Sequence, residues 1–181
     1  MLAFALRADG WYLRQDIIWH KPNPMPESVR DRCTKSHEYL FLLSKNRKYY
    51  YDNEAIKEPV KQDWGTRNRD QGKYHNEGTG LQPHTGLTKS YTTKNKRSVW
   101  SITNKPYKGA HFAVFPPDLI EPCILAGSER GDIILDPFMG SGTTGMVAKK
   151  HGRNYIGCEL HEDYASLQTD RIDSVPQQLV L

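Results

Sequence analysis

Apolar side chains in the first part of the chain follow patterns typical of β-strands. Residues 13–19 end in an apolar run just before three closely spaced prolines, and residues 38–43 are apolar over most of their length. Each segment therefore predicts one strand. The tyrosine-rich residues 48–51 predict a third strand, close enough along the chain to pair with the other two. We expect these tyrosines, Trp19 and the later Trp100 to be core or sheet-face residues rather than platforms that stack on bases.

The second half of the chain has the pattern of an α/β protein. Apolar residues recur at helical spacing over residues 116–126, which open with two prolines, a residue type accepted at the first turn of a helix. Residues 133–135 then predict a short buried strand, residues 142–151 a helix closed by glycine, and residues 155–158 a second strand. Strand, helix and strand in this order predict a β-α-β unit with parallel strands.

The middle of the chain, residues 61–98, has a different composition. Its only aliphatic residues are Leu81 and Leu87, and the wider stretch 57–110 has a net charge of +7 within a total of +4. Such a segment cannot build a core of its own, so one interpretation is a solvated insertion. The alternative is a loop that binds nucleic acid, because basic residues alternate with Trp64 and two tyrosines. The candidate phosphate-binding residues are Arg67, Arg69, Lys73, Lys89, Lys94, Lys96 and Arg97.

Composition excludes several classes of protein. The chain has 181 residues, enough for one domain with appendages, and no apolar run approaches the ~18–20 residues of a membrane-spanning helix. Without a basic start or a long apolar core the opening residues do not resemble a signal peptide, so we expect a cytoplasmic protein. Three cysteines without a Cys-x-x-Cys pair predict buried thiols, and the histidine spacing predicts no metal site.

The turn of the β-α-β unit carries the candidate chemistry. Gly140, Gly142 and Gly145 have the spacing G-x-G-x-x-G between a strand and a helix, and Glu159 ends the next strand. Glycine lets the backbone turn sharply and approach a ligand, and the acid can accept hydrogen bonds from a ribose, so an adenosine-bearing cofactor is expected. The carboxylate of Asp136 repels a pyrophosphate, which favours S-adenosylmethionine over a dinucleotide. The alternative is a glycine turn that only permits close packing.

These residues resemble the amino-methylating DNA methyltransferases. The resemblance is carried by the motif at 136–144, by residues 111–119 and by residues 97–102. It implies a Rossmann-like methyltransferase sheet, mostly parallel and incomplete at the N-terminus, in which residues 61–98 form the target-recognition insertion. It implies S-adenosylmethionine as cofactor and double-stranded DNA as substrate, in a restriction-modification context. The expected cofactor-binding residues, with Asp136, are Phe115, Pro116, Asp118, Phe138, Gly140, Gly142, Thr143 and Glu159.

One element of this family is missing from the sequence. The family places Asp, Asn or Ser, then Pro-Pro and an aromatic residue, where the target amine is held and the flipped base is stacked. The only Pro-Pro pair is Pro116-Pro117, in the cofactor-flanking segment. The catalytic residues therefore stay unknown, with Asp16 and Asn23 as weak candidates. We expect either a truncated chain or a partner chain or upstream segment that supplies the block, including a strand between 133–135 and 14–19.

The sequence leaves three functions open. The first is transfer of a methyl group from S-adenosylmethionine to the exocyclic amine of adenine or cytosine in duplex DNA. The second is an inert remnant that still binds DNA or cofactor, and the third, which Asp136 disfavours, is a nicotinamide-dependent oxidoreductase. The expected division assigns 1–60 to the catalytic side of the body, 61–98 to recognition and 99–181 to cofactor binding.

Overall fold

The computed structural model describes residues 2–60, 92–104 and 114–176. The chain divides into two compact units. The first unit combines Met1–Ile56 with Arg97–Leu181, and the second is Lys57–Lys96. The first unit contains the helices, two of the sheets and the glycine turn.

The first sheet of this unit has the strand order β2-β1-β5. The long strand β1 (Tyr12–His20) pairs antiparallel with β2 (His37–Ser44) and parallel with the short β5 (Val99–Ser101). Trp19 lies opposite Trp100 in this register, and the two side chains are only 5% and 6% exposed. Both strands predicted before residue 45 are therefore confirmed, as are the two core tryptophans, whereas β5 was not predicted.

The third strand predicted in this region is wrong. Residues 48–51 lie outside any strand, and the three tyrosine side chains are between 41% and 45% exposed. Their contacts lie elsewhere: the Arg14 guanidinium stacks 4.8 Å from the centre of the Tyr49 ring, and the Asp52 amide donates to the Ala126 carbonyl over 2.9 Å. A run of tyrosines is typical of a strand because aromatic rings pack well on the face of a sheet. Here a cation–π contact and a backbone hydrogen bond to the end of α2 replace the hydrogen bonds between strands.

The second sheet of the unit belongs to the β-α-β segment. Strands β6 (Ile133–Asp136) and β7 (Asn154–Gly157) are parallel and in register, and α3 (Thr143–Lys150) connects them. Helix α2 (Pro117–Gly127) precedes them, with proline in its first turn. These elements agree with the predicted segments to within about two residues, the usual uncertainty of element ends, and the α/β fold class is confirmed.

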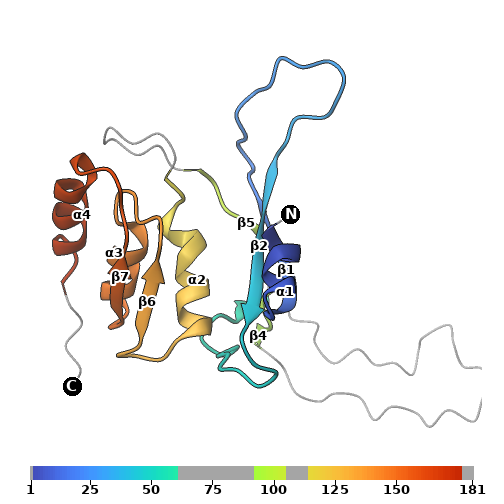
Figure 1. Cartoon of the computed structure of the whole chain (residues 1–181). Helices are drawn as coiled ribbons and strands as arrows, with labels where there is room; N and C mark the ends of the chain where they lie inside the picture. The colour runs from blue at the N-terminus through green and yellow to red at the C-terminus, as the bar shows by residue number, and fades with distance from the viewer. Residues whose placement is uncertain (1, 61–91, 105–113, 177–181) are drawn as a thin grey trace, which may run out of the picture. The chain divides into compact units, whose positions relative to one another are not determined.

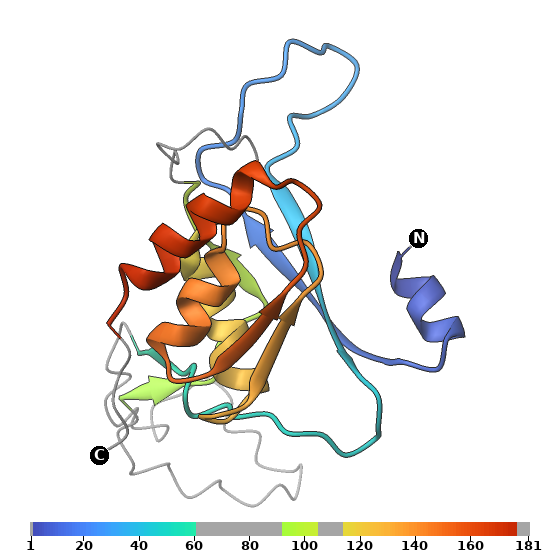
Figure 2. The same ribbon diagram turned by 60° about the vertical axis from the view of Figure 1, so that its left-hand side comes forward.

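Two helices of the first unit were not predicted. Helix α1 (Leu2–Ala8) precedes β1, and α4 (Asp163–Asp173) follows β7. Figures 1 and 2 show α4 lying against α3, with the start of the β6–β7 pair beneath them. Helix α1 has only seven residues, too few to show a clear helical period, and α4 is mostly polar, so its apolar periodicity is weak.

Helix α2 joins the two sheets through two apolar clusters. On one side Leu119 packs with Trp19 and Trp100, and on the other Ile124 packs with Val147 and Ala148 of α3. Figure 1 shows α2 between the β6–β7 pair and the first sheet. The helix therefore fixes the glycine turn after β6 relative to the end of β1.

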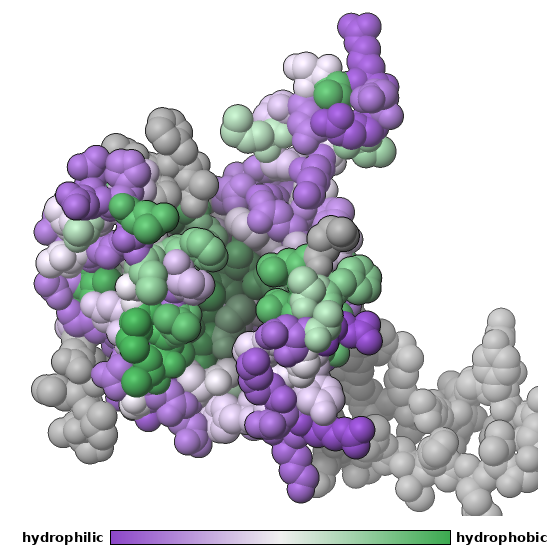
Figure 3. All heavy atoms as spheres, viewed as in Figure 1, coloured by the Kyte–Doolittle hydropathy of each residue, from purple (hydrophilic) through white to green (hydrophobic). Residues whose placement is uncertain are grey.

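The edge of strand β6 that faces away from β7 is unpaired among the described strands. Among the described strands it pairs only with β7. Ile133, Leu135 and Ile156 share one face of the pair, and they are 62%, 64% and 54% exposed. Figure 3 shows apolar residues gathered over this region and in the hollow beside it. Aliphatic side chains at such exposure mark a face that another element is expected to cover.

The second unit is described only at its two ends. Strands β3 (Glu58–Pro59) and β4 (Thr93–Lys94) pair antiparallel, and the Val60 amide donates to the Thr92 carbonyl over 2.9 Å. Most of the predicted insertion 61–98 lies outside the described residues, so the division into 1–60, 61–98 and 99–181 stays a prediction.

The cysteine prediction is wrong. Cys33 and Cys158 are exposed and Cys123 is half-buried. Cysteine is buried on average, but Cys33 lies in a proline-flanked loop and Cys158 at the end of β7, where little packs over them. A search of the described residues finds no helix whose length and apolarity would let it cross a bilayer.

Candidate cofactor-binding site

The site is built at the carboxyl ends of β6 and β7. Parallel strands end at the same edge of a sheet, and open α/β sheets bind their ligands there. Beyond the ladder the Cys158 amide donates to the Asp136 carbonyl, and the Met139 amide donates to the Cys158 carbonyl, each over 2.9 Å. The two loops that follow the strands therefore run side by side, which brings Glu159 to the glycine turn.

Two glycines of the turn have backbone angles that other residues rarely adopt. Gly140 has a φ of 52° and Gly142 a φ of 80°, both in the left-handed region. A Cβ at Gly142 would also lie 3.2 Å from the Cα of Gln168. The third glycine of the motif has another reason: a Cβ at Gly145 would lie 2.5 Å from the Met139 side chain, so this glycine serves packing.

Asp136 holds the turn from inside. Its Oδ1 accepts from the Phe138 amide over 2.9 Å, and its Oδ2 accepts from the Thr144 hydroxyl over 2.5 Å. Each carboxylate oxygen can accept more than one hydrogen bond, so both keep capacity toward a ligand. Asp136 thus shapes the turn in addition to bringing a negative charge to the strand end.

Glu159 closes the turn from the second strand. Its Oε2 accepts from the Gly140 amide over 2.8 Å, and its Oε1 accepts from the His161 amide over 2.9 Å. The residue is exposed, so the carboxylate is open to solvent beside the glycines. An acid held in this position has the geometry needed to accept hydroxyl groups of a ribose.

The residues between these two acids differ sharply in burial. Phe138 is 86% exposed, whereas Met139 is 5% exposed and supports the turn from below. Thr143, at the first position of α3, is 3% exposed. Phe138 is therefore the ring that a ligand above the turn can contact, and Thr143 belongs to the turn's buried base.

The predicted residues at 115–118 lie at the start of α2. Phe115 packs against the cluster of Trp19, Trp100 and Leu119, and Pro116 is buried directly before the helix. Asp118 is exposed in the first turn of α2. A carboxylate in this position interacts favourably with the helix dipole.

The two weak catalytic candidates occupy different environments. Asp16 is exposed on β1, opposite Phe41 of β2. Asn23 binds the backbone of Asn104 on both sides of its amide, donating over 3.2 Å and accepting over 3.1 Å. Asn23 therefore serves to connect two loops, which makes it a poor holder of a substrate amine.

Of the candidate DNA-binding residues, Lys94, Lys96 and Arg97 are described. Lys94 and Lys96 are half-buried and Arg97 is exposed. The others, Arg67, Arg69, Lys73 and Lys89, lie outside the described residues, and so do Trp64 and the two tyrosines between them.

Sequence reasoning missed the contribution of α4. The Gln168 side-chain amide donates to the Gly140 carbonyl over 2.7 Å, and Arg171 donates to the Ser141 hydroxyl over 2.7 Å. The two residues are three apart on one helix, which places them on the same face. The apolar spacing of Tyr164, Leu167 and Ile172 around them was the signal that could have revealed a docked helix.

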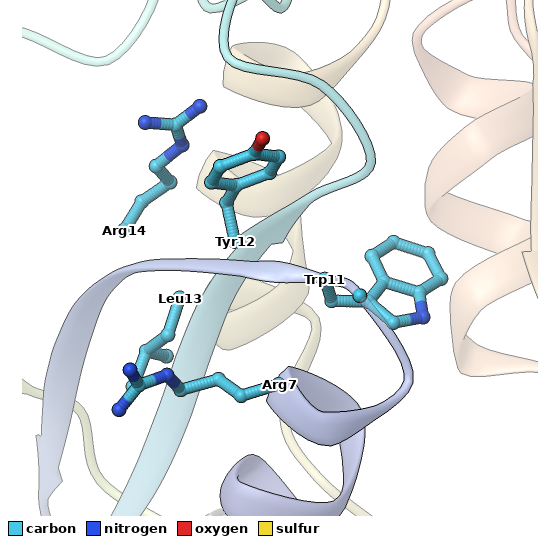
Figure 4. A pocket seen from close by; sticks show the side chains of 6 residues that line it. Arg7, Trp11, Tyr12, Leu13 and Arg14 are labelled. Atoms are coloured by element: carbon cyan, nitrogen blue, oxygen red, sulfur yellow. The ribbon is translucent and has the colours of Figure 1, made fainter.

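A separate pocket lies between α1 and β1, and Figure 4 shows it from close by. It is lined by Arg7 and residues 10–14, and the labelled side chains point in different directions. Ligand sites need polar groups that converge on one point. The pocket therefore lacks the features expected of a cofactor site, and the glycine turn stays the candidate.

The known proteins to which this chain is similar are DNA methylases. A family model described as DNA methylase matches residues 1–170. The chain is 52% identical over 171 residues to the type II methyltransferase M.SmaI of Serratia marcescens, covering 94% of this chain and 50% of that protein. It is 48% identical over 171 residues to M.XycI of Xanthomonas campestris pv. cyanopsidis, covering 94% of this chain and 48% of the relative. The chain thus spans about half the length of these curated relatives.

Solved structures are similar over nearly the whole chain. The M1.HpyAVI–SAM complex has a TM-score of 0.62 and 26% sequence identity, over 94% of this chain and 67% of that one. The PvuII DNA methyltransferase, described as cytosine-N4-specific, has a TM-score of 0.66 at 19% identity, over 99% of this chain and 57% of that one. At 19% identity the second likeness shows the fold alone.

Proposed function

Because the chain belongs to the DNA methylase family, whose model matches residues 1–170, we propose that it takes part in DNA methylation. The proposed reaction transfers a methyl group from S-adenosylmethionine to the exocyclic amine of adenine or cytosine in duplex DNA. The observation that carries the proposal is the glycine turn after β6, with Glu159 bonded to the Gly140 amide. The proposed location is the cytoplasm. The relatives named above come from bacteria, whose DNA lies in that compartment.

The turn fits S-adenosylmethionine in shape and in charge. Gly140 is half-buried, so the backbone of the turn is partly open to a ligand there, and Phe138 offers an exposed ring beside it. Glu159 accepts from the ribose hydroxyls, while Asp136 and Asp118 bring negative charge toward the cationic methionine part. The carboxylate of Asp136 at the end of β6 disfavours the pyrophosphate of a dinucleotide, which speaks against the oxidoreductase alternative.

The cofactor supplies an electrophilic methyl group on a positively charged sulfur. The residues of the chain contribute by binding and orienting it, and Thr143 and Met139 keep the turn packed while they do so. Direct transfer to an amine needs no covalent intermediate with the enzyme, so positioning accounts for most of the rate. An extrahelical base must still be held next to the methyl group.

Binding of the DNA substrate is assigned to the basic segment 61–98. Lys94, Lys96 and Arg97 are the described members of that group. Lysine and arginine side chains neutralise phosphates, and aromatic side chains such as Trp64 can stack on bases. This assignment includes Arg67, Arg69, Lys73 and Lys89.

The group that holds the target amine is assigned to a segment or partner outside this chain. The proposed segment contributes a strand that ends in Pro-Pro-aromatic and pairs with the edge of β6 opposite β7. Two observations support this: the exposed Ile133 and Leu135 beside that edge, and the relatives' length, about twice what the chain covers. An added strand satisfies the open edge of β6, and the apolar face needs a further part of the same segment or partner that packs over it.

Transfer of a radiolabelled methyl group to mixed-sequence duplex DNA tests the proposal. We expect no incorporation by the chain alone, because lost positioning removes roughly 7–11 kcal/mol of barrier lowering. Adding the part of the Serratia marcescens relative that lies outside the match, in cis or as a second chain, should restore it. The matched control is the same added part with any Pro-Pro-aromatic block that its sequence contains replaced by alanine, which should not restore transfer.

Two outcomes would contradict parts of the proposal. Robust incorporation by the chain alone would place the amine-holding group within it, with Asp16 and Asn23 as the first residues to replace. No incorporation in any combination, together with retained binding of DNA or S-adenosylhomocysteine, would favour the inert remnant.

A further inference from the structure

Helix α4 contacts the glycine turn through hydrogen bonds as well as by packing. Gln168 Nε2 donates to the Gly140 carbonyl and Arg171 Nη1 to the Ser141 hydroxyl, both over 2.7 Å. Ser141 is 2% exposed, so the arginine reaches a buried hydroxyl. These two contacts join residues 28 and 30 positions apart in the sequence.

Packing between the helix and the turn leaves little freedom. A Cβ at Gly142 would lie 3.2 Å from the Gln168 Cα, and one at Gly145 would lie 2.9 Å from the Ile172 side chain. Ile172 is itself 4% exposed. The backbone of the turn therefore rests directly on α4, and a shift of the helix has to move the turn.

Gly140 is held on both sides of its backbone. Its amide donates to Glu159 over 2.8 Å, and its carbonyl accepts from Gln168 over 2.7 Å. Its φ of 52° lies in the left-handed region, one of several that glycine adopts readily, so the two hydrogen bonds select this conformation among them. The position of the Glu159 carboxylate and the position of α4 are thus coupled through one glycine.

We propose that Gln168 is a positioning residue for the cofactor, and that α4 sets the affinity of the glycine turn for S-adenosylmethionine. The inference rests on the proposed function only in naming that ligand. Gln168 acts through Gly140: its hydrogen bond holds the turn in the conformation that presents Glu159 to a ribose. Arg171 supports the same conformation through Ser141.

The test replaces Gln168 by methionine, which keeps the side-chain length and removes the donor. Loss of one hydrogen bond of this kind should weaken binding of S-adenosylhomocysteine about 2- to 10-fold, measured by calorimetry on the full chain. The matched control is Asp173→Asn, which removes the α3–α4 ion pair between Lys149 and Asp173 without touching the turn. The control should bind with unchanged affinity.

A second readout does not depend on the ligand. The amide resonances of Gly140 and Gly142 should shift in Gln168→Met and stay in place in Asp173→Asn, while Gly127, at the end of α2, stays in place in both. Urea denaturation shows whether Gln168→Met and Asp173→Asn change the free energy of unfolding by the same amount. If Gln168→Met does not fold, Gln168→Glu replaces it, since it also lacks the donor and faces the carbonyl with a carboxylate.

The outcomes separate the inference from the proposed function. Equal affinity of wild type and Gln168→Met, with unchanged glycine resonances, would overturn the positioning role. Equal weakening by Gln168→Met and Asp173→Asn would reduce the effect to helix docking and would also overturn it. Failure of the wild type to bind S-adenosylhomocysteine would contradict the cofactor assignment, and the glycine resonances would then decide the role of Gln168 alone.

Discussion

The three glycines of the turn are required for different physical reasons. Gly140 and Gly142 have positive φ angles, whereas Gly145 leaves room for Met139 and Ile172. The motif G-x-G-x-x-G thus combines two physical requirements under one spacing. Of the three glycines, Gly140 is half-buried, whereas Gly142 and Gly145 are buried.

Replacement of Gly142 by alanine tests this distinction at the residue scale. We expect a loss of about 1–2 kcal/mol in the free energy of unfolding, because an L-residue is strained at a φ of 80° and its Cβ approaches α4. Urea denaturation measures it. The matched control is Gly127→Ala, where a Cβ has nothing within 4 Å, and it should stay within about 0.5 kcal/mol of the wild type. Equal losses in both variants would contradict the argument.

At the scale of elements, α2 and α3 are joined by a charged contact as well as by their apolar cluster. Glu121 Oε1 on α2 accepts from Lys150 Nζ over 2.8 Å and from His151 Nε2 over 2.7 Å. Partial burial acts to raise the pKa of Glu121, but the hydrogen bonds from Lys150 and His151 outweigh it, so the pKa lies below the usual 4.5. The ionised form is therefore favoured by folding.

A carboxylate with a lowered pKa stabilises the fold above its unfolded pKa and loses that contribution as the pH falls through its folded pKa. Replacing Glu121 by glutamine should cost about 0.5–1 kcal/mol at pH 7, the range of a partly exposed ion pair. The difference from wild type should shrink below about pH 4.5. Denaturation midpoints between pH 3 and 7 measure it, with Glu162→Gln on exposed Glu162 as control. A difference that stays constant with pH would contradict the assignment.

At the scale of the whole molecule, charge is unevenly distributed along the chain. Residues 57–110 have a net charge of +7 and residues 111–181 a net charge of −5. DNA binding through the basic part implies that affinity falls as salt rises, because each neutralised phosphate releases counterions. The acidic part contains the proposed cofactor turn.

Removing two charges from the basic part should change this salt dependence. Replacing Lys94 and Lys96 by alanine should lower the slope of log affinity against log salt by about 0.9 for each lost contact, and adding Arg67→Ala and Arg69→Ala should lower it further. The matched control removes Lys45 and Lys48, two lysines of the loop after β2, and should leave the slope unchanged. Fluorescence anisotropy with duplex DNA measures it. Equal salt-dependence slopes in all variants would contradict the DNA-binding role and favour the interpretation of residues 61–98 as a solvated insertion.

The β-α-β unit, its glycine turn and the acid that follows β7 could all be predicted from the amino-acid sequence. These features depend on local rules: strand and helix periods, glycine at a sharp turn, and the short distance along the chain from Gly140 to Glu159. The two core tryptophans followed from the same reasoning, since large rings gain most from burial. The family resemblance pointed to the same turn.

Only the tertiary structure decided which contacts support that turn. Gln168 and Arg171 reach it from a helix 28 and 30 residues away, and no spacing rule specifies such a contact. The exposure of Tyr49–Tyr51 and of Cys33 and Cys158 was likewise set by which elements pack over them. Periodicity and propensity describe neighbours along the chain, whereas burial and side-chain hydrogen bonds depend on how distant elements dock. That docking places α4 against the glycine turn, where Gln168 bonds to Gly140.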